Sequence, residues 1–268
     1  MNLKKSGHTF EDIIWRVYPD EIQNKLIIET RNNENRLTNF YCYDIITHHI
    51  EIINLEISEK WWLGIEDVHD GNIYFHYYNA VEFSNHRSIL CYNFNLNQIV
   101  WQHPNLEFHK LTKDVVIAIK QSKTAKLYLK LNIQNGEVLE SMNSIEMQKN
   151  DIDALLKLKN ECIFSPTIFA KLDADFDLVS LFIQKKLGVV AEHSLEYLEF
   201  GNYIIISFYI FDREMLVNKL LVISLEGNIV LEEVLMDAQK GAGVGTFFVC
   251  NGKLIFVKLK YELFVYEL

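Results

Sequence analysis

A short local pattern recurs along the chain and limits the fold more than any other feature of the sequence. In each complete copy, an apolar segment with strand character ends in a polar residue, and a turn-forming residue follows four positions later. A second apolar segment then begins. The polar residues that mark the six copies are Asp44, Asn93, Asn132, Gln184, Ser224 and Glu267. Their spacings are 49, 39, 52, 40 and 43 residues, with a mean of about 45, and this period predicts an array of similar small sheets.

The last copy is incomplete, because the chain stops where its second strand would begin. A similar strand occurs near the other terminus, where Asp12–Trp15 matches Gln98–Trp101. We therefore predict that Ile13–Val17 pairs with Tyr261–Leu268 and closes the array into a ring without an open edge. The same match predicts that Trp15 and Trp101 take equivalent, mainly buried places.

Short strands with a period of about 40–50 residues, closed into a ring, are typical of β-propellers. The predicted fold is all-β: a single β-propeller domain over residues 1–268, closed by the N-terminal strand pairing with the C-terminal blade. Six blades are expected, with five or seven as alternatives, because residues 132–184 are long and irregular. Only Asp151–Lys159 has helical spacing of its apolar residues.

The repeat also resembles those of quinoprotein-like and WD-type propellers, in which a strand, an Asp or Asn, a turn residue and a strand ending in Trp follow one another. The matching residues are Asp44, Asn93, Asn132, Gly136, Gly188, Trp15 and Trp101. The copies at Gln184, Ser224 and Glu267 depart from the pattern. On Ile28–Arg31, Trp61–Ile65 and the segment from Phe247 to Leu268, the chain is similar to a bacterial family of unknown function. These resemblances imply a single cytosolic propeller and supply no activity.

Composition narrows the classes of partner. The chain has 36 acidic and 26 basic residues, which gives a net charge of -10. A chain with this charge would be repelled by phosphate backbones and by anionic lipids. We therefore expect neither nucleic acid nor a membrane as a partner. The N-terminus lacks the apolar stretch of a secretory signal, and no apolar run is long enough for a membrane helix. The four cysteines are widely separated, which favours free thiols and a cytoplasmic location.

Five residues form the candidate binding site. Glu29 and Arg31 are two positions apart on a predicted strand, so they share one face and can pair. Trp61 and Trp62 are adjacent, which on a strand would point one ring toward the blade interior and the other toward the channel or its rim. His76 follows a predicted hairpin. We predict that Trp62, Arg31 and Glu29 lie together and recognise a ligand, the alternative being a structural ion pair with the Trp rings packed elsewhere.

No catalytic, cofactor or metal motif accompanies these residues. His69 and His76 flank the predicted hairpin without the tight spacing of a zinc site, and Asp173, Asp175 and Asp177 lack the Gly and Glu of an EF-hand loop. We therefore expect no cofactor and no metal. Two classes of function stay open: a scaffold that binds a protein or peptide, and a hydrolase or lyase that acts on a sugar or lactone at the channel mouth. A quinone-dependent oxidoreductase is a weaker third class.

Overall fold

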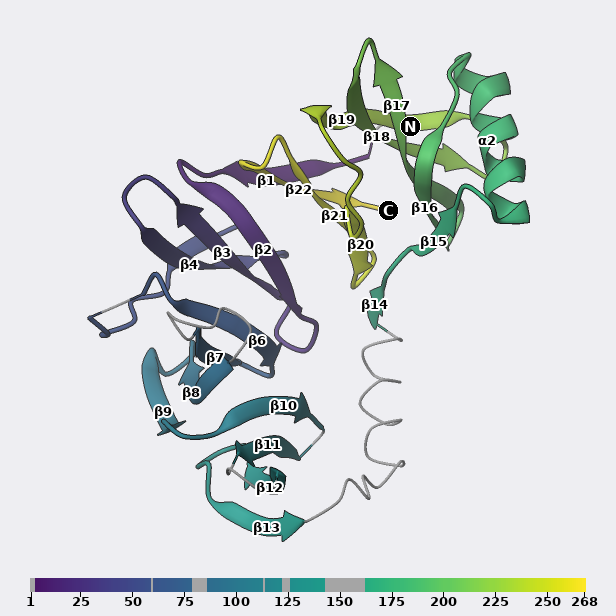
Figure 1. Ribbon diagram of the computed structural model, residues 1–268. Coiled ribbons are helices and arrows are strands. Elements are labelled where there is room, and N and C mark those ends of the chain that lie inside the picture. The colour runs from purple at the N-terminus through teal and green to yellow at the C-terminus, as the bar shows by residue number, and fades with distance from the viewer. Residues whose placement is uncertain (1–2, 59, 79–85, 113, 122–125, 143–161) are drawn as a thin grey trace. The chain divides into compact units, whose positions relative to one another are not determined.

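The computed structural model describes residues 3–58, 60–78, 86–112, 114–121, 126–142 and 162–268 (Figure 1). They divide between two compact units, one within residues 12–161 and the other made of residues from 1–11 and 162–268. Within the described residues the strands form five antiparallel sheets of four or five strands each. A mostly β fold of antiparallel sheets is confirmed, whereas neither the count of six blades nor the closure of a ring is confirmed. Among the same residues, no helix combines the length and the apolarity that crossing a membrane requires.

The unit within residues 12–161 contains three four-stranded sheets whose strands follow the order of the sequence. The first sheet consists of β2 (Ile13–Asp20), β3 (Lys25–Asn32), β4 (Leu37–Asp44) and β5 (Ile50–Ile52). The second consists of β6 (Leu63–His69), β7 (Asn72–Tyr78), β8 (His86–Asn93) and β9 (Gln98–His103). The third consists of β10 (Glu107–Leu111), β11 (Val115–Gln121), β12 (Lys126–Asn132) and β13 (Val138–Met142).

Apolar side chains fill the space between successive sheets of this unit. Ile27 and Phe40 of the first sheet pack with Phe75 and Leu90 of the second in one buried cluster. Tyr74 and Trp101 belong to a second cluster, with Val116 and Leu131 of the third sheet. The second sheet thus packs against apolar side chains on both faces, which explains why Ile73, Tyr74 and Phe75 of its second strand are all buried and do not alternate with exposed residues.

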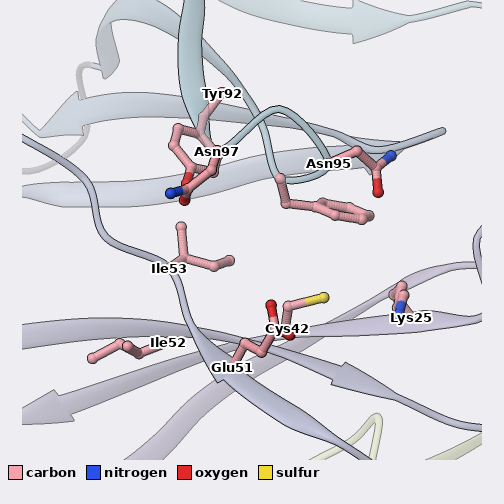
Figure 2. A pocket seen from close by; sticks show the side chains of 9 residues that line it. Lys25, Cys42, Glu51, Ile52, Ile53, Tyr92, Asn95 and Asn97 are labelled. Atoms are coloured by element: carbon pink, nitrogen blue, oxygen red, sulfur yellow. The ribbon is translucent and has the colours of Figure 1, made fainter. Parts of the chain in front are cut away.

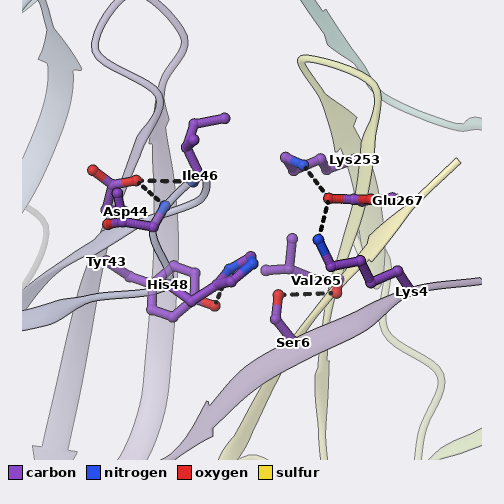
Figure 3. Close-up of polar contacts among 10 residues, drawn as sticks. Lys4, Ser6, Tyr43, Asp44, Ile46, His48, Lys253, Val265 and Glu267 are labelled. Carbon is purple, nitrogen blue, oxygen red and sulfur yellow. Dashed lines mark hydrogen bonds and ion pairs between the residues drawn. The ribbon is translucent and has the colours of Figure 1, made fainter.

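The recurring polar residue of the sequence pattern caps the turn between the third and fourth strands. The Asp44 carboxylate accepts hydrogen bonds from the amides of Ile46 and Thr47, each at 2.8 Å, as Figure 3 shows for Ile46. Asn132 does the same for the amides that follow it, and the amide of the residue four positions on donates to its carbonyl, as in the first turn. That residue, His48 or Gly136, has a positive φ. The repeat therefore marks a self-capped turn.

Asp44 gives a testable consequence of this cap. Burial opposes its ionisation, but the bonds from Lys25 and from the two amides outweigh burial and lower the pKa of Asp44 to about 2. A lowered carboxyl pKa stabilises the folded state above the unfolded pKa, and this gain is lost as pH falls from about 4 toward 2. We expect Asp44→Asn to keep the turn, as Asn93 and Asn132 do, and to lose stability less steeply over that range. Urea unfolding of both proteins between pH 2 and 5 tests this, and parallel curves would contradict it.

The second unit contains two five-stranded sheets and a helix. One sheet has the order β1 (Lys5–Thr9), β22 (Glu262–Glu267), β21 (Lys253–Lys258), β20 (Phe247–Cys250) and β14 (Ile163–Phe164). The other has the order β15 (Thr167–Ala170), β16 (Glu192–Phe200), β17 (Tyr203–Asp212), β18 (Met215–Ser224) and β19 (Ile229–Gln239). Ile205 and Val222 of the latter pack with Phe247 and Leu254 of the former.

An N-terminal strand does pair with the C-terminal one, but it is not the predicted strand. β1 is antiparallel to β22, and Glu267 at the end of β22 accepts bonds from Lys4 and Lys253 (Figure 3). Ile13–Val17 lies in β2 and pairs with β3, so the predicted pairing of that segment with Tyr261–Leu268 is wrong. The match between the two tryptophans was misleading, because the strand that pairs with β22 is a polar segment without Trp, Tyr or Phe.

The segment around Gln184 is a helix and not a strand of the repeat. Helix α2 (Ala174–Leu187) buries Phe176 and Ile183 against its neighbouring sheet, and Gly188 ends it with a left-handed backbone. Asp173 occupies the N-cap position without a side-chain capping bond, and Asp175 and Asp177 lie in the first turn, so these aspartates belong to a helix start and not to a metal loop. The predicted helix at Asp151–Lys159 lies outside the described residues.

Candidate functional site

Each sheet of the unit within residues 12–161 begins with an edge strand that carries a β-bulge. The extra residue is Trp15 in β2, Glu66 in β6 and His109 in β10, because the register with the second strand slips there. A bulge re-aims its side chain and leaves it without a cross-strand partner. Trp15 therefore corresponds to Glu66 and His109, and its predicted equivalence to Trp101 is wrong. Trp15 is 54% exposed, whereas Trp101, in the fourth strand of its sheet, is 7% exposed.

Glu29 and Arg31 form a buried ion pair on β3. The Nε of Arg31 donates to Oε1 of Glu29 at 2.6 Å, and the two side chains are 11% and 2% exposed respectively. Burial raises the pKa of Glu29, and the charge and hydrogen bond of Arg31 oppose that rise. Arg31 thus favours the charged form of a carboxyl that burial pushes toward its protonated form.

The remaining nitrogens of Arg31 hold the segment that precedes β6. Its two terminal nitrogens donate to the carbonyls of Trp61 at 3.1 Å and Leu63 at 2.9 Å. The carbonyl of Trp62, between them, accepts a bond from the Tyr78 amide at 2.7 Å. Trp61 and Trp62 therefore lie in a fixed turn and not on a strand, and their rings meet edge to face at 6.5 Å. The prediction that they point to opposite sides of a sheet is wrong.

Three aromatic rings surround the Arg31 guanidinium. The ring centres of Trp61, Trp15 and Tyr78 lie 5.4, 5.6 and 5.9 Å from its Cζ, all within cation–π distance. Together with Trp62, these rings form what we call the aromatic surface. Trp15 is exposed, while the other three are partly buried. The outer layer of the site is therefore aromatic, and the ion pair that supports it is buried beneath.

His76 lies in the buried layer of the same region. It is 1% exposed, its Nδ1 is 3.0 Å from Oε1 of Glu66, and its ring packs edge-on against Tyr78 at 4.4 Å. Gly64 lies opposite it, where a Cβ would come within 2.8 Å of the imidazole. Glycine at 64 thus leaves the room that the edge-to-face rings of His76 and Tyr78 occupy.

The five predicted residues come together to different degrees. Glu29, Arg31 and Trp61 are in direct contact, and Trp62 touches Trp61. His76 contacts this group only indirectly: its ring packs against Tyr78, and the Tyr78 ring in turn lies near the Arg31 guanidinium. The sequence reasoning missed Trp15 and Tyr78 as residues of this site, because the bulge that turns Trp15 toward Arg31 is seen only in the strand register. The binding role of these residues stays a prediction. Within the described part of the chain, no three His, Cys, Asp or Glu side chains gather as a metal site would require.

A separate pocket lies toward the other end of β3, away from Arg31. Its volume is about 240 Å³ (Figure 2). Its walls come from the first sheet and from the β8–β9 turn: Lys25, Cys42, Glu51, Ile52, Ile53, Tyr92, Phe94, Asn95 and Asn97. Burial raises the pKa of the Cys42 thiol to about 12, so this thiol is not a nucleophile at neutral pH.

Comparison with known proteins shows what part of the chain is similar to, but it assigns the chain no activity. Residues 19–101 match the model of a domain of unknown function, DUF4905, and this span contains all five predicted site residues and the whole pocket lining. No curated protein matches the chain. The matched segment covers the strands from β3 to β8 and most of β9.

Several solved structures of low sequence identity resemble the chain. The Dos1 propeller is 10% identical with a TM-score of 0.39, and the match covers 99% of this chain and 95% of that one. Oligogalacturonate lyase in complex with manganese is 10% identical with a TM-score of 0.33, over 100% and 97% of the two chains. The propeller domain of the Trilobed protease from Pyrococcus furiosus is 6% identical with a TM-score of 0.32, over 92% and 63%. Similarities this weak assign no function.

Proposed function

We propose that the chain is a cytoplasmic scaffold that presents the aromatic surface to a protein or peptide. One observation supports this function above others: the exposed Trp15 ring, carried by a bulge, stands beside Arg31, whose guanidinium is held by a buried carboxylate and two carbonyls. Trp, Tyr and Arg are the residues that dominate binding energy in protein interfaces. Rings fixed on a rigid base also lose little freedom when they bind.

Arg16 indicates what the partner carries beside its apolar group. This exposed residue follows Trp15 and donates to the Tyr18 hydroxyl at 3.0 Å. That bond and the charge of Glu29 both raise the pKa of Arg16, so its guanidinium stays charged at the surface. A partner with an aromatic or long apolar side chain next to a carboxylate would cover Trp15 and pair with Arg16 at the same time.

The aromatic surface is tested by removing its most exposed ring. We expect Trp15→Ala to abolish capture of the partner. The melting temperature should change little, because about half of the Trp15 side chain is exposed to solvent in the folded protein. Affinity purification from native cells with quantitative mass spectrometry compares this variant with the wild type and with Leu172→Ala, which removes a side chain that is 98% exposed in the other unit. Identical sets of captured proteins from all three would contradict the proposal.

A hydrolase or lyase is the second candidate, and the contact between His76 and Glu66 favours it. A histidine oriented by a carboxylate can act as a general base. The imidazole is nearly inaccessible, however, and is walled by Gly64 and Tyr78, so a substrate does not reach it in this arrangement. For this reason binding ranks first. Turnover that His76→Ala abolishes, with partner capture retained, would favour the enzyme.

A further inference from the structure

The pocket of Figure 2 occupies a place that a tryptophan fills between the next two sheets. In the second sheet, Cys91 lies two residues before the capping Asn93, and Trp101 is its cross-strand partner. In the first sheet, Cys42 lies two residues before the capping Asp44, and its cross-strand partner is Glu51. The strand registers thus make Glu51 the counterpart of Trp101.

The surroundings of Trp101 show how this place holds an indole. Its Nε1 donates to the carbonyl of Ile133 at 3.1 Å, just after the capping Asn132 of the third sheet. The ring lies against Gly136, where a Cβ would come within 2.8 Å of it. By the same counting from the capping residue, Phe94 corresponds to Ile133 and Asn97 to Gly136. Both Phe94 and Asn97 line the pocket.

Glu51 does not fill the corresponding space in the first sheet. Its side chain is 72% exposed and contacts His49 at the surface, with Nε2 of His49 3.0 Å from Oε1 of Glu51. The pocket of about 240 Å³ that remains is smaller than the roughly 300–1,000 Å³ of sites for drug-sized ligands. It therefore suits one ring system and not a whole nucleotide or cofactor.

We propose that this pocket binds an aromatic side chain of a peptide, with tryptophan as the best fit. The ring would stack on the Asn97 amide and Ile53, and its N–H would reach the Phe94 carbonyl as Trp101 reaches that of Ile133. The site is independent of the aromatic surface, because Lys25 at the pocket and Arg31 at that surface are at opposite ends of β3.

The test uses N-acetyl-L-tryptophanamide as the probe and the full chain as the receptor. In the wild type we expect saturable changes in the side-chain amide NMR signals of Asn95 and Asn97, both in the pocket wall. N-acetyl-L-alaninamide, which has the same backbone without a ring, should cause none. Unchanged Asn95 and Asn97 signals at millimolar probe, or equal changes with the alanine analogue, would overturn the proposal without involving Trp15.

A variant that rebuilds the filled arrangement sharpens the result. Glu51→Trp should place its own indole in the pocket, raise the melting temperature and weaken probe binding by at least about tenfold. Glu51→Gln, the matched control, should leave the pocket open and bind like the wild type. A Glu51→Trp protein that folds and binds the probe as well as the wild type would show that the probe occupies another place.

Discussion

Truncating Trp101 to alanine is expected to lower the free energy of unfolding by about 3–5 kcal/mol, the range for a large aromatic side chain removed from a core. The ring is 7% exposed, packs 6.0 Å from Tyr74, and belongs to the cluster that joins the second and third sheets. The carbonyl of Ile133 would also lose the indole N–H as its donor. Urea unfolding followed by circular dichroism measures the change.

The matched control is the other tryptophan of the misleading sequence match. Trp15→Ala removes the same side chain from an exposed bulge, so its effect on unfolding should stay near the usual ±0.5 kcal/mol of surface changes. Equal losses for the two variants would show that Trp101 does not join the sheets as described.

Removing Arg31 is expected to cost a similar amount, about 3–5 kcal/mol, because it leaves the buried Glu29 carboxylate without its partner. The carbonyls of Trp61 and Leu63 would lose a donor as well. Lys219→Ala is the matched control, since the Lys219–Glu232 pair has the same 2.6 Å separation but is more exposed and should contribute at most about 1 kcal/mol. Arg31→Ala is consequently a poor test of binding, because stability and recognition would fall together.

The cost of Arg31→Ala should depend on pH in a definite direction. Without the guanidinium, only the charge of Arg16 and the backbone bond from Ile65 oppose burial, so the pKa of Glu29 rises further. A raised carboxyl pKa means that the folded state loses stability as pH rises through it, and regains stability when Glu29 is protonated. The difference in melting temperature between wild type and variant should therefore shrink from pH 7.5 to pH 5. A difference that grows over this range would exclude the mechanism, and adding Glu29→Gln should relieve part of the loss.

The turns of the fold were predictable because the conformation of each turn depends only on the capping residue and the four residues that follow it. Asp44, Asn93 and Asn132 cap amides in their own turns, so no distant contact is needed. The same locality explains the error at Gln184. Gly188 donates to the carbonyl of Gln184 at 2.9 Å with a left-handed backbone, just as Gly136 does to Asn132. A helix end and a hairpin turn share this bond, and a local pattern does not separate them.

The site was less predictable because its contacts cross between sheets. The two-residue spacing of Glu29 and Arg31 was enough to predict a shared face, and they pair. The contact between Arg31 and Trp61 depends on how the first two sheets pack against each other. The spacing of residues within one strand cannot predict that packing. Trp15 was misplaced for a different reason, since one extra residue in a bulge moves every later side chain to the other face of the strand.

The pairing of β1 with β22 has a consequence for how the chain is made. Apart from β1–β22 and β14–β20, all paired strands among the described residues are consecutive in the sequence, so most of each sheet can form as synthesis proceeds. β1 leaves the ribosome before every other described strand, and its partner is the last of them. An apolar strand would be exposed to misassembly throughout that delay. The segment Lys5–Thr9 has no large apolar residue and stays mostly exposed even when it is paired. While it is unpaired during synthesis, it therefore offers little apolar surface to which other segments could bind.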